Sequence, residues 1–307
     1  MEYSILVLKQ SVIMFLIACI GIICYKTKII TKDAQKFFSA FVLKVVIPCF
    51  AFISFQVELS AELISGMLAA LLLSVVSHIL LILLSMIVIR KKEGTEYAIE
   101  RFSLIYTNCG FMGIPLISGV FGPEGALYAT IYLTVFNILV WTHGVMIMKN
   151  QFSLKELLVV LRSPTMIAIF LGILCLVFGI RLPEVARKPL DYIASMNTPL
   201  PMTIAGVMIA QNSLLATLKD FRAMVISVLR LLILPIIVFL VLRLIPCDNI
   251  VLMSIMLSIS CPTATIGTLF AIEHNKNAAY ASRIFAITTV LSSVTMPLMI
   301  LFMNLFN

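Results

Sequence analysis

The chain has 307 residues, of which 62% are apolar and only 12% are charged, whereas ordinary soluble domains are about 45–50% apolar and about 25% charged. This composition excludes a water-soluble globular domain, an intrinsically disordered chain and a disulfide-rich extracellular scaffold. The formal net charge of +8 does not indicate a nucleic-acid partner, because most basic residues fall in short loops between apolar segments.

Long apolar runs bounded by charged or turn residues predict an all-α membrane protein with ten transmembrane helices. A helix needs about 20 apolar residues to cross the hydrocarbon layer, so ten crossings use about 200 residues and leave no room for a separate soluble domain. The runs lack the period-two alternation of a transmembrane β-barrel. The ten predicted helices span residues 5–24, 37–57, 65–89, 102–120, 126–148, 164–181, 190–211, 222–245, 249–272 and 279–304.

The basic residues predict the orientation of these helices in a cytoplasmic membrane. Loops that follow odd-numbered helices contain fifteen Lys and Arg residues, and loops that follow even-numbered helices contain four. Short cytoplasmic loops carry the excess of basic residues. We therefore expect the odd-numbered loops in the cytoplasm and both termini on the extracytoplasmic side.

A weak internal similarity predicts two halves of opposite orientation. GALYATIYLTVFNI (125–138), in the fifth helix, is similar to NAAYASRIFAITTV (277–290), in the tenth, at an offset of 152 residues. A unit of five helices crosses the membrane an odd number of times, so its second copy enters from the opposite face, which gives an inverted repeat. The predicted divisions are a first repeat at 1–150, a cytoplasmic linker at 151–163 and a second repeat at 164–307. Leucines at helical spacing suggest that the linker forms a short surface helix. Chance similarity of two apolar helices remains the alternative.

Two of the predicted helices contain glycine and proline where an unbroken helix would disfavour them. The fourth contains NCGFMGIPL (108–116) and the ninth contains SCPTATIGT (260–268), at corresponding positions in the two halves. Proline removes a backbone donor and clashes with the preceding turn, and glycine makes unwinding less costly. Paired interruptions of this kind indicate a binding site at the membrane midplane, where half-helix N-termini attract anions. The predicted site residues are Asn108, Gly110, Gly113, Pro115, Ser260, Pro262, Thr263 and Thr265.

The same segments carry a resemblance to a known family. NCGFMGIPL is similar to the N-x-G-F-x-G-x-P-L signature of the fourth helix in the auxin efflux carrier family. SCPTATIGTLFA resembles the proline-bearing ninth helix of that family, VVIPCFAFISF its second helix and ASRIFAITTVLSSVTMPL its last helix. The resemblance therefore extends along the whole chain.

This resemblance implies a ten-helix secondary carrier whose fourth and ninth helices cross near their prolines. It implies scaffold helices 1, 2, 6 and 7, moving transport helices 3–5 and 8–10, an elevator mechanism and often a homodimer. The implied substrates are small organic anions, either auxin-like monocarboxylates or dicarboxylates such as malate and malonate. The linker has about 15 residues, so the chain resembles the bacterial branch rather than the plant exporters with their long central loop.

Charges within the predicted helices favour an anionic ligand. All fourteen acidic residues fall in loops or at helix ends, and a cation antiporter would instead be expected to hold its ion with a buried carboxylate. Lys44 in the second helix and Arg230 in the eighth are candidates for pairing with an anion. The alternative is that both extend their long stems to the cytoplasmic interface.

Three further polar residues are weaker candidates. His78 in the third helix and His143 in the fifth could couple a proton to transport, since histidine titrates near physiological pH; structural hydrogen bonds to a neighbouring helix are the alternative. Asn137 in the fifth helix could join Asn108 at the site or instead hold two helices together. The seven cysteines form no metal-ligand pattern, so neither a metal nor another cofactor is expected.

Two functions compete at this level. The first is a secondary carrier of a small organic anion in a lipid bilayer, working by alternating access. The second is a membrane sensor that keeps the shell of a transporter and binds a ligand without moving it. An intramembrane enzyme is not expected, because the sequence contains no HExxH motif, no pair of intramembrane aspartates and no G-x-S-x-G motif.

Overall fold

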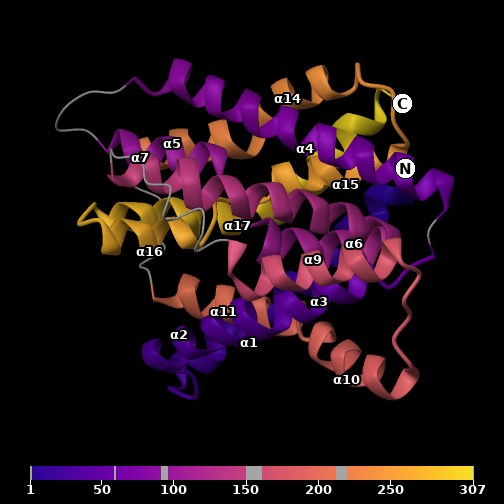
Figure 1. Ribbon diagram of the computed structural model, residues 1–307. Coiled ribbons are helices and arrows are strands. Elements are labelled where there is room, and N and C mark those ends of the chain that lie inside the picture. Colours follow the sequence, from indigo (N-terminus) through magenta and orange to yellow (C-terminus); the bar gives the residue numbers. More distant parts are fainter. Residues whose placement is uncertain (1, 59, 91–95, 150–160, 212–219, 307) are drawn as a thin grey trace.

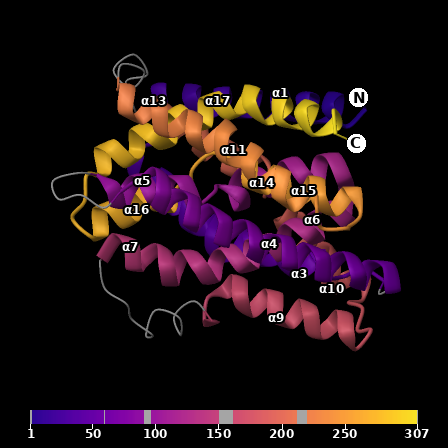
Figure 2. The same ribbon diagram turned by 90° about the horizontal axis from the view of Figure 1, so that it is seen from above.

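A computed structural model describes residues 2–58, 60–90, 96–149, 161–211 and 220–306. Within these ranges the protein is helical, and the only strand-like pairing is one isolated antiparallel bridge between Thr107 and Thr263. The helices run roughly along one direction, and the two chain termini lie at the same end of the bundle (Figures 1 and 2).

The first part of the chain forms three apolar helical segments. α1 spans Glu2–Lys26 and α4 spans Ala61–Val88. Between them, α2 (Lys32–Phe41), a π-helical turn η1 (Val42–Val46) and α3 (Ile47–Ser54) run on as one stretch. Thr31 and Ser60 cap α2 and α4, because their side chains accept hydrogen bonds from the backbone N–H groups of Ala34 and Leu63.

The next segments include a long helical stretch with a sharp bend. α5 spans Tyr97–Ile105, η2 spans Cys109–Gly113, α6 spans Ile114–Leu139, η3 spans Val140–Gly144 and α7 spans Val145–Lys149. Gly122, with φ 64° and ψ −152°, interrupts α6 in a conformation that L side chains rarely adopt, and Pro123 follows it. The chain turns there between two helices, close to the predicted boundary at 120–126.

The second part contains the remaining helices. They are α9 (Pro164–Val177), α10 (Glu184–Ser195), α11 (Pro199–Ala210), α13 (Phe221–Val228) with η4 (Leu229–Ile233) and α14 (Leu234–Leu242), α15 (Asn249–Ser260), α16 (Ile266–Glu273) and α17 (Ala278–Asn304).

Seven of the described helical segments are long and apolar enough to cross a membrane: 8–26, 32–54, 61–88, 109–149, 184–210, 221–242 and 278–304. This confirms a multi-pass helical membrane protein. α9 and α15 are apolar but shorter, and the 109–149 stretch contains the bend at Gly122. The prediction of a short helix in the linker falls mainly on residues 150–160, which lie outside the described residues.

α15 is the centre of the core. Each of its residues from Val251 to Ser260 is buried, as expected for a helix that is apolar on all sides. It packs against α6, α4 and α17. By contrast, α1, α4 and α9 expose many large apolar side chains, among them Phe15, Leu68 and Phe170, which suits contact with lipid.

α1 and α11 approach so closely that small residues are required between them. A Cβ added at Gly21 would collide with the carbonyl oxygen of Thr203, and one added at Gly206 would collide with the carbonyl oxygen of Ala18. Glycine thus allows backbone-to-backbone packing, as is usual where membrane helices meet.

We predict that Gly206→Ala lowers the free energy of unfolding by about 2 kcal/mol, because the obstructing atoms belong to backbone and cannot rotate away. Gly110→Ala is the matched control, since its Cβ would meet only side-chain tips of Leu133 and Ile47 at 3.4 and 3.6 Å. Thermal unfolding in detergent measures both variants. Equal midpoints for the two would contradict the close approach.

Candidate functional site

Two interrupted helices meet in the interior of the bundle. Residues Tyr106–Asn108 separate α5 from η2, and residues Cys261–Thr265 separate α15 from α16. The N–H of Asn108 donates to the carbonyl of Pro262 at 2.8 Å, and the N–H of Ala264 donates to the carbonyl of Tyr106 at 2.9 Å. The two unwound segments therefore satisfy each other's backbone groups. We call this arrangement the crossing.

The structure shifts one predicted interruption. Pro262 lies within the break of the ninth predicted helix, as the sequence suggests. Pro115, however, lies in the first turn of α6, and the break ends earlier, at Asn108. Pro115 follows the π-helical turn η2 inside a continuous helical stretch, so its missing N–H coincides with a local change in helical hydrogen bonding and not with the break itself.

Polar side chains at the crossing include buried groups without a partner. The hydroxyl of Thr265 donates to Oδ1 of Asn108 at 3.2 Å, and the N–H of Thr263 donates to Oγ1 of Thr288 at 3.3 Å. Among the described residues, Nδ2 of Asn108 and Oγ1 of Thr107 are buried without a hydrogen-bond partner. An amide that presents two free donors in an apolar interior is suited to a ligand oxygen.

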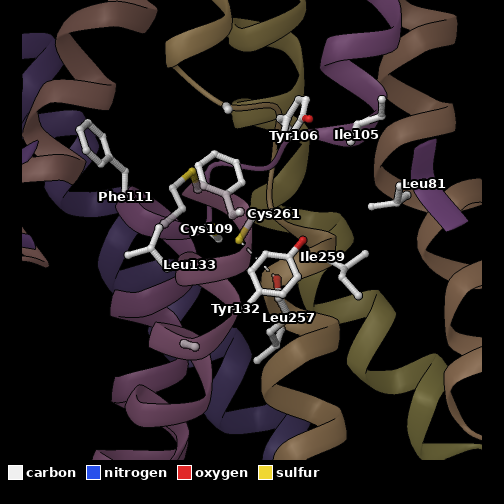
Figure 3. Close-up of a cluster of buried hydrophobic side chains, with 14 of the residues drawn as sticks. Leu81, Ile105, Tyr106, Cys109, Phe111, Tyr132, Leu133, Leu257, Ile259 and Cys261 are labelled. Carbon is white, nitrogen blue, oxygen red and sulfur yellow. Dashed lines mark hydrogen bonds between the residues drawn. The ribbon is translucent and has the colours of Figure 1, made fainter. Parts of the chain in front are cut away.

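One glycine of the fourth-helix motif, Gly113, allows close packing at the crossing. A Cβ at Gly113 would lie 3.0 Å from Sγ of Cys261 and 3.7 Å from Cα of Ser258, whereas Gly110 faces Leu133 and Ile47. Figure 3 shows Cys109, Cys261 and Tyr132 gathered around this contact. Gly113 therefore lets η2 approach the end of α15. Ser260 is buried there too, but its hydroxyl donates to the carbonyl of Met256 in its own helix at 2.7 Å.

Arg230 places a guanidinium group at the crossing. Its side chain is fully buried, and Nη2 donates to the carbonyl oxygens of Ile259 at 2.6 Å and Cys261 at 3.0 Å. Nε and Nη1 have no hydrogen-bond partner within the described part of the chain. Arg230 therefore does not extend to a membrane interface, which was the alternative interpretation of its position.

His78 lies beside Tyr132. It is fully buried, its Nδ1 bonds to the carbonyl of Ser74 at 2.7 Å, and its ring is 4.8 Å from that of Tyr132. Nε2 of His78 and the hydroxyl of Tyr132 also have no partner among the described residues. The charge of Arg230 acts on both side chains. The crossing thus borders a buried polar cluster made of Arg230, His78 and Tyr132.

Three predicted residues lie elsewhere. Lys44 is exposed on the outer surface of η1, as expected if its stem reaches an interface. Asn137 is half-buried near the end of α6, and no described contact joins it to Asn108. Nδ1 of His143 bonds at 2.9 Å to the hydroxyl of Tyr106, whose backbone carbonyl belongs to the crossing. His143 is thus linked to the crossing indirectly.

Comparison with known proteins identifies the family. The model of a family described as membrane transport protein matches residues 6–156 and 150–300. The chain belongs to the auxin efflux carrier family. This is a family of transporters rather than of enzymes.

Two archaeal relatives of this family member are also named as transporters. An uncharacterized transporter of Methanothermobacter thermautotrophicus is 28% identical over 196 residues, which are 62% of this chain and 63% of the relative. An uncharacterized transporter of Methanocaldococcus jannaschii is 26% identical over 199 residues, 59% of this chain and 61% of the relative. The matched region spans less than two thirds of each relative's length.

This member of the auxin efflux carrier family contains an ionic cluster around Glu100 that the sequence does not predict. Glu100, in the first turn of α5, is completely buried. It accepts hydrogen bonds from Nε and Nη2 of Arg222, the second at 2.9 Å, and from the hydroxyl of Tyr280 at 2.9 Å. Nearby, Arg283 pairs with Asp220 at 3.0 Å. The cluster joins the starts of α5, α13 and α17. Arg222 and Tyr280 are 122 and 180 residues away from Glu100 in the sequence, so no local sequence pattern predicts the cluster.

We predict that Glu100→Gln destabilises the protein by about 2 kcal/mol, because a buried carboxylate that receives charge-assisted bonds is replaced by an amide that must turn a donor toward Arg222. Asp33→Asn is the matched control. Asp33 pairs with Lys36 at 3.1 Å, but both side chains are largely exposed, and an exposed pair contributes little. The thermal midpoints in detergent compare the variants. A midpoint for Glu100→Gln as high as that of the control would contradict the structural role of the cluster.

Proposed function

We propose that this protein is a secondary carrier that moves a small organic anion across the cytoplasmic membrane by alternating access. The observation that carries the proposal is the crossing, where two broken helices leave the amide donors of Asn108 buried and unpartnered, and where a buried guanidinium binds the end of α15. Unwound backbone in a membrane interior is tolerated only where protein buries it or where it lines a cavity. Paired broken helices are typical of carrier binding sites.

The proposed ligand group is a carboxylate. Its oxygens would accept hydrogen bonds from Nδ2 of Asn108 and from hydroxyl groups at the crossing, such as that of Thr107. η2 and α16 both begin at the crossing, and a helix start favours negative charge. Arg230 adds a full positive charge in a region of low dielectric constant. An auxin-like monocarboxylate and a malate-like dicarboxylate both fit this chemistry.

The proposed architecture has ten transmembrane helices in two inverted repeats. The seven long apolar segments supply it if the 109–149 stretch is divided at Gly122 and the two shorter helices, α9 and α15–α16, also cross. The interruption within α15–α16 explains why no long helix is found there. In this architecture helices 1, 2, 6 and 7 form the scaffold, the others form the moving domain, and two copies of the chain form a homodimer.

The orientation follows from the distribution of basic residues. With odd-numbered loops in the cytoplasm, both termini are extracytoplasmic, and both lie at the same end of the bundle (Figure 1). The cluster around Glu100 then lies toward the cytoplasm. The hydrogen bond between His143 and Tyr106 supports the proposal that His143 couples a proton to transport.

We predict that Asn108→Ala reduces transport at least tenfold while the protein stays folded. The substitution removes both free amide donors and only one internal contact, the bond from Thr265 at 3.2 Å. Counterflow of labelled substrate into proteoliposomes measures transport, and gel filtration checks folding. Asn137→Ala is the matched control, because it removes an amide side chain that lies outside the crossing. Wild-type counterflow by Asn108→Ala would remove Asn108 from the site.

A screen of mono- and dicarboxylates against the purified protein should find ligands that raise its thermal midpoint, because a ligand that binds only the folded state stabilises it. Matched neutral amides of the same compounds are the control, and we expect them to produce no shift. Binding without counterflow would favour a sensor over a carrier. Equal shifts for acids and amides would contradict an anion site.

A further inference from the structure

We infer that the guanidinium group of Arg230 binds the carbonyl end of α15 at the crossing and takes the place of a coupling metal ion there. The crossing then forms without bound sodium. The inference rests on the proposed carrier function only for its consequence for coupling. Its structural part concerns the protein without substrate and can be tested separately.

The guanidinium group of Arg230 lies at the C-terminal end of α15. α15 ends at Ser260, and the carbonyls of its last turn have no helical partner. Nη2 of Arg230 binds two carbonyl oxygens at this end, those of Ile259 and Cys261. A helix C-terminus carries about half a negative charge. In carriers with broken helices, such carbonyls and half-helix ends are the groups that coordinate a sodium ion. Arg230 therefore occupies the position of the ion with a covalently attached charge.

No carboxylate compensates the charge of Arg230 in the described part of the chain. Arg230 takes part in none of the ion pairs found there. The side chains on which its charge acts are His78, Tyr132, Cys109 and Cys261, and none of them is an acid of the Asp or Glu type. A fully buried, unpaired cation is costly in a membrane. The partial negative charge of the carbonyls at the end of α15 compensates the positive charge of Arg230.

The residue that corresponds to Arg230 in the first half of the chain is His78. His78 and Arg230 are 152 residues apart, which is the offset of the repeat between 125–138 and 277–290. In the proposed repeat the two residues thus occupy equivalent positions in α4 and η4. Nδ1 of His78 bonds to a carbonyl of its own helix, so His78 does not bridge to a broken helix as Arg230 does. The permanent charge is therefore supplied by one half only.

The guanidinium also retains donors for a ligand. Nη2 is used by the two carbonyls, whereas Nε and Nη1 are buried without a partner among the described residues. A metal ion coordinated by carbonyls would offer a ligand no hydrogen-bond donor. Arg230 combines both tasks, since one nitrogen fixes the helix end and two nitrogens remain for an anionic group.

The structural part is tested on the substrate-free protein by thermal unfolding. We expect the wild-type midpoint to be the same in sodium chloride and in choline chloride. We expect Arg230→Ala to have a lower midpoint that rises by several degrees in 20 mM guanidinium chloride and not in 20 mM urea, which has a similar shape and no charge. Arg243→Gln, which removes an exposed arginine beyond the end of α14, is the matched control and should respond to neither.

Two results would overturn the inference. One is a wild-type midpoint that depends on sodium, and the other is an Arg230→Ala midpoint that urea raises as much as guanidinium does or that neither compound raises. If Arg230→Ala cannot be purified, Arg230→Lys and Arg230→Gln replace it. The inference requires Lys to keep a midpoint clearly above that of Gln, and equal midpoints would overturn it.

The consequence for coupling is tested in proteoliposomes with a carboxylate found by the ligand screen. We expect uptake to change less than twofold when sodium is replaced by choline, and at least a tenfold drop in uptake would overturn the inference. Absence of uptake under all conditions would instead contradict the carrier function and leave the thermal result standing as a statement about the crossing.

Discussion

The requirement that every backbone polar group be paired inside a membrane governs this structure. An unpaired N–H or C=O in hydrocarbon costs several kcal/mol, and a helix that stops halfway leaves such groups at both sides of its break. Here two breaks are placed together, so that the N–H of Asn108 and the carbonyl of Pro262 pair, as do the N–H of Ala264 and the carbonyl of Tyr106. Arg230 then covers carbonyls that remain at the end of α15. Neither interruption would be stable without the other.

Most of the helical architecture could be predicted from the sequence, because apolar length is dictated by bilayer thickness. Elements such as α4 and α17 lie within a few residues of their predicted limits. The number of separate membrane-spanning helices is harder to predict. Gly122 divides a continuous apolar stretch through its backbone conformation alone, and composition cannot show that. The packing of α1 on α11 also escaped prediction, since Gly21 and Gly206 are distant in sequence and have meaning only once the helices touch.

The candidate site was predicted by residue type more accurately than by geometry. The glycine and proline signals identified both interrupted segments, but the first break ends at Asn108, where the chain pairs with the second segment through the bridge between Thr107 and Thr263. Arg230 and Lys44 looked alike in the sequence, each inside an apolar run ahead of a proline. The structure buries one and exposes the other, because only Arg230 meets unpaired carbonyls. Glu100 looked like an end-of-helix acid until Arg222 and Tyr280 were brought to it.

The same constraint limits how a ligand could reach Asn108, which is only 6% exposed. Opening the site by separating the two broken helices would rupture both crossing hydrogen bonds in a region without water to replace them. That cost would recur in each transport cycle. A motion that keeps the crossing intact and shifts it as one block against the outer helices avoids this cost. The outer helices α1 and α9 expose many large apolar side chains, so their faces are candidates for the surface along which such a block could move. For the proposed carrier, rigid-body movement is therefore the form of alternating access that keeps the backbone pairing intact.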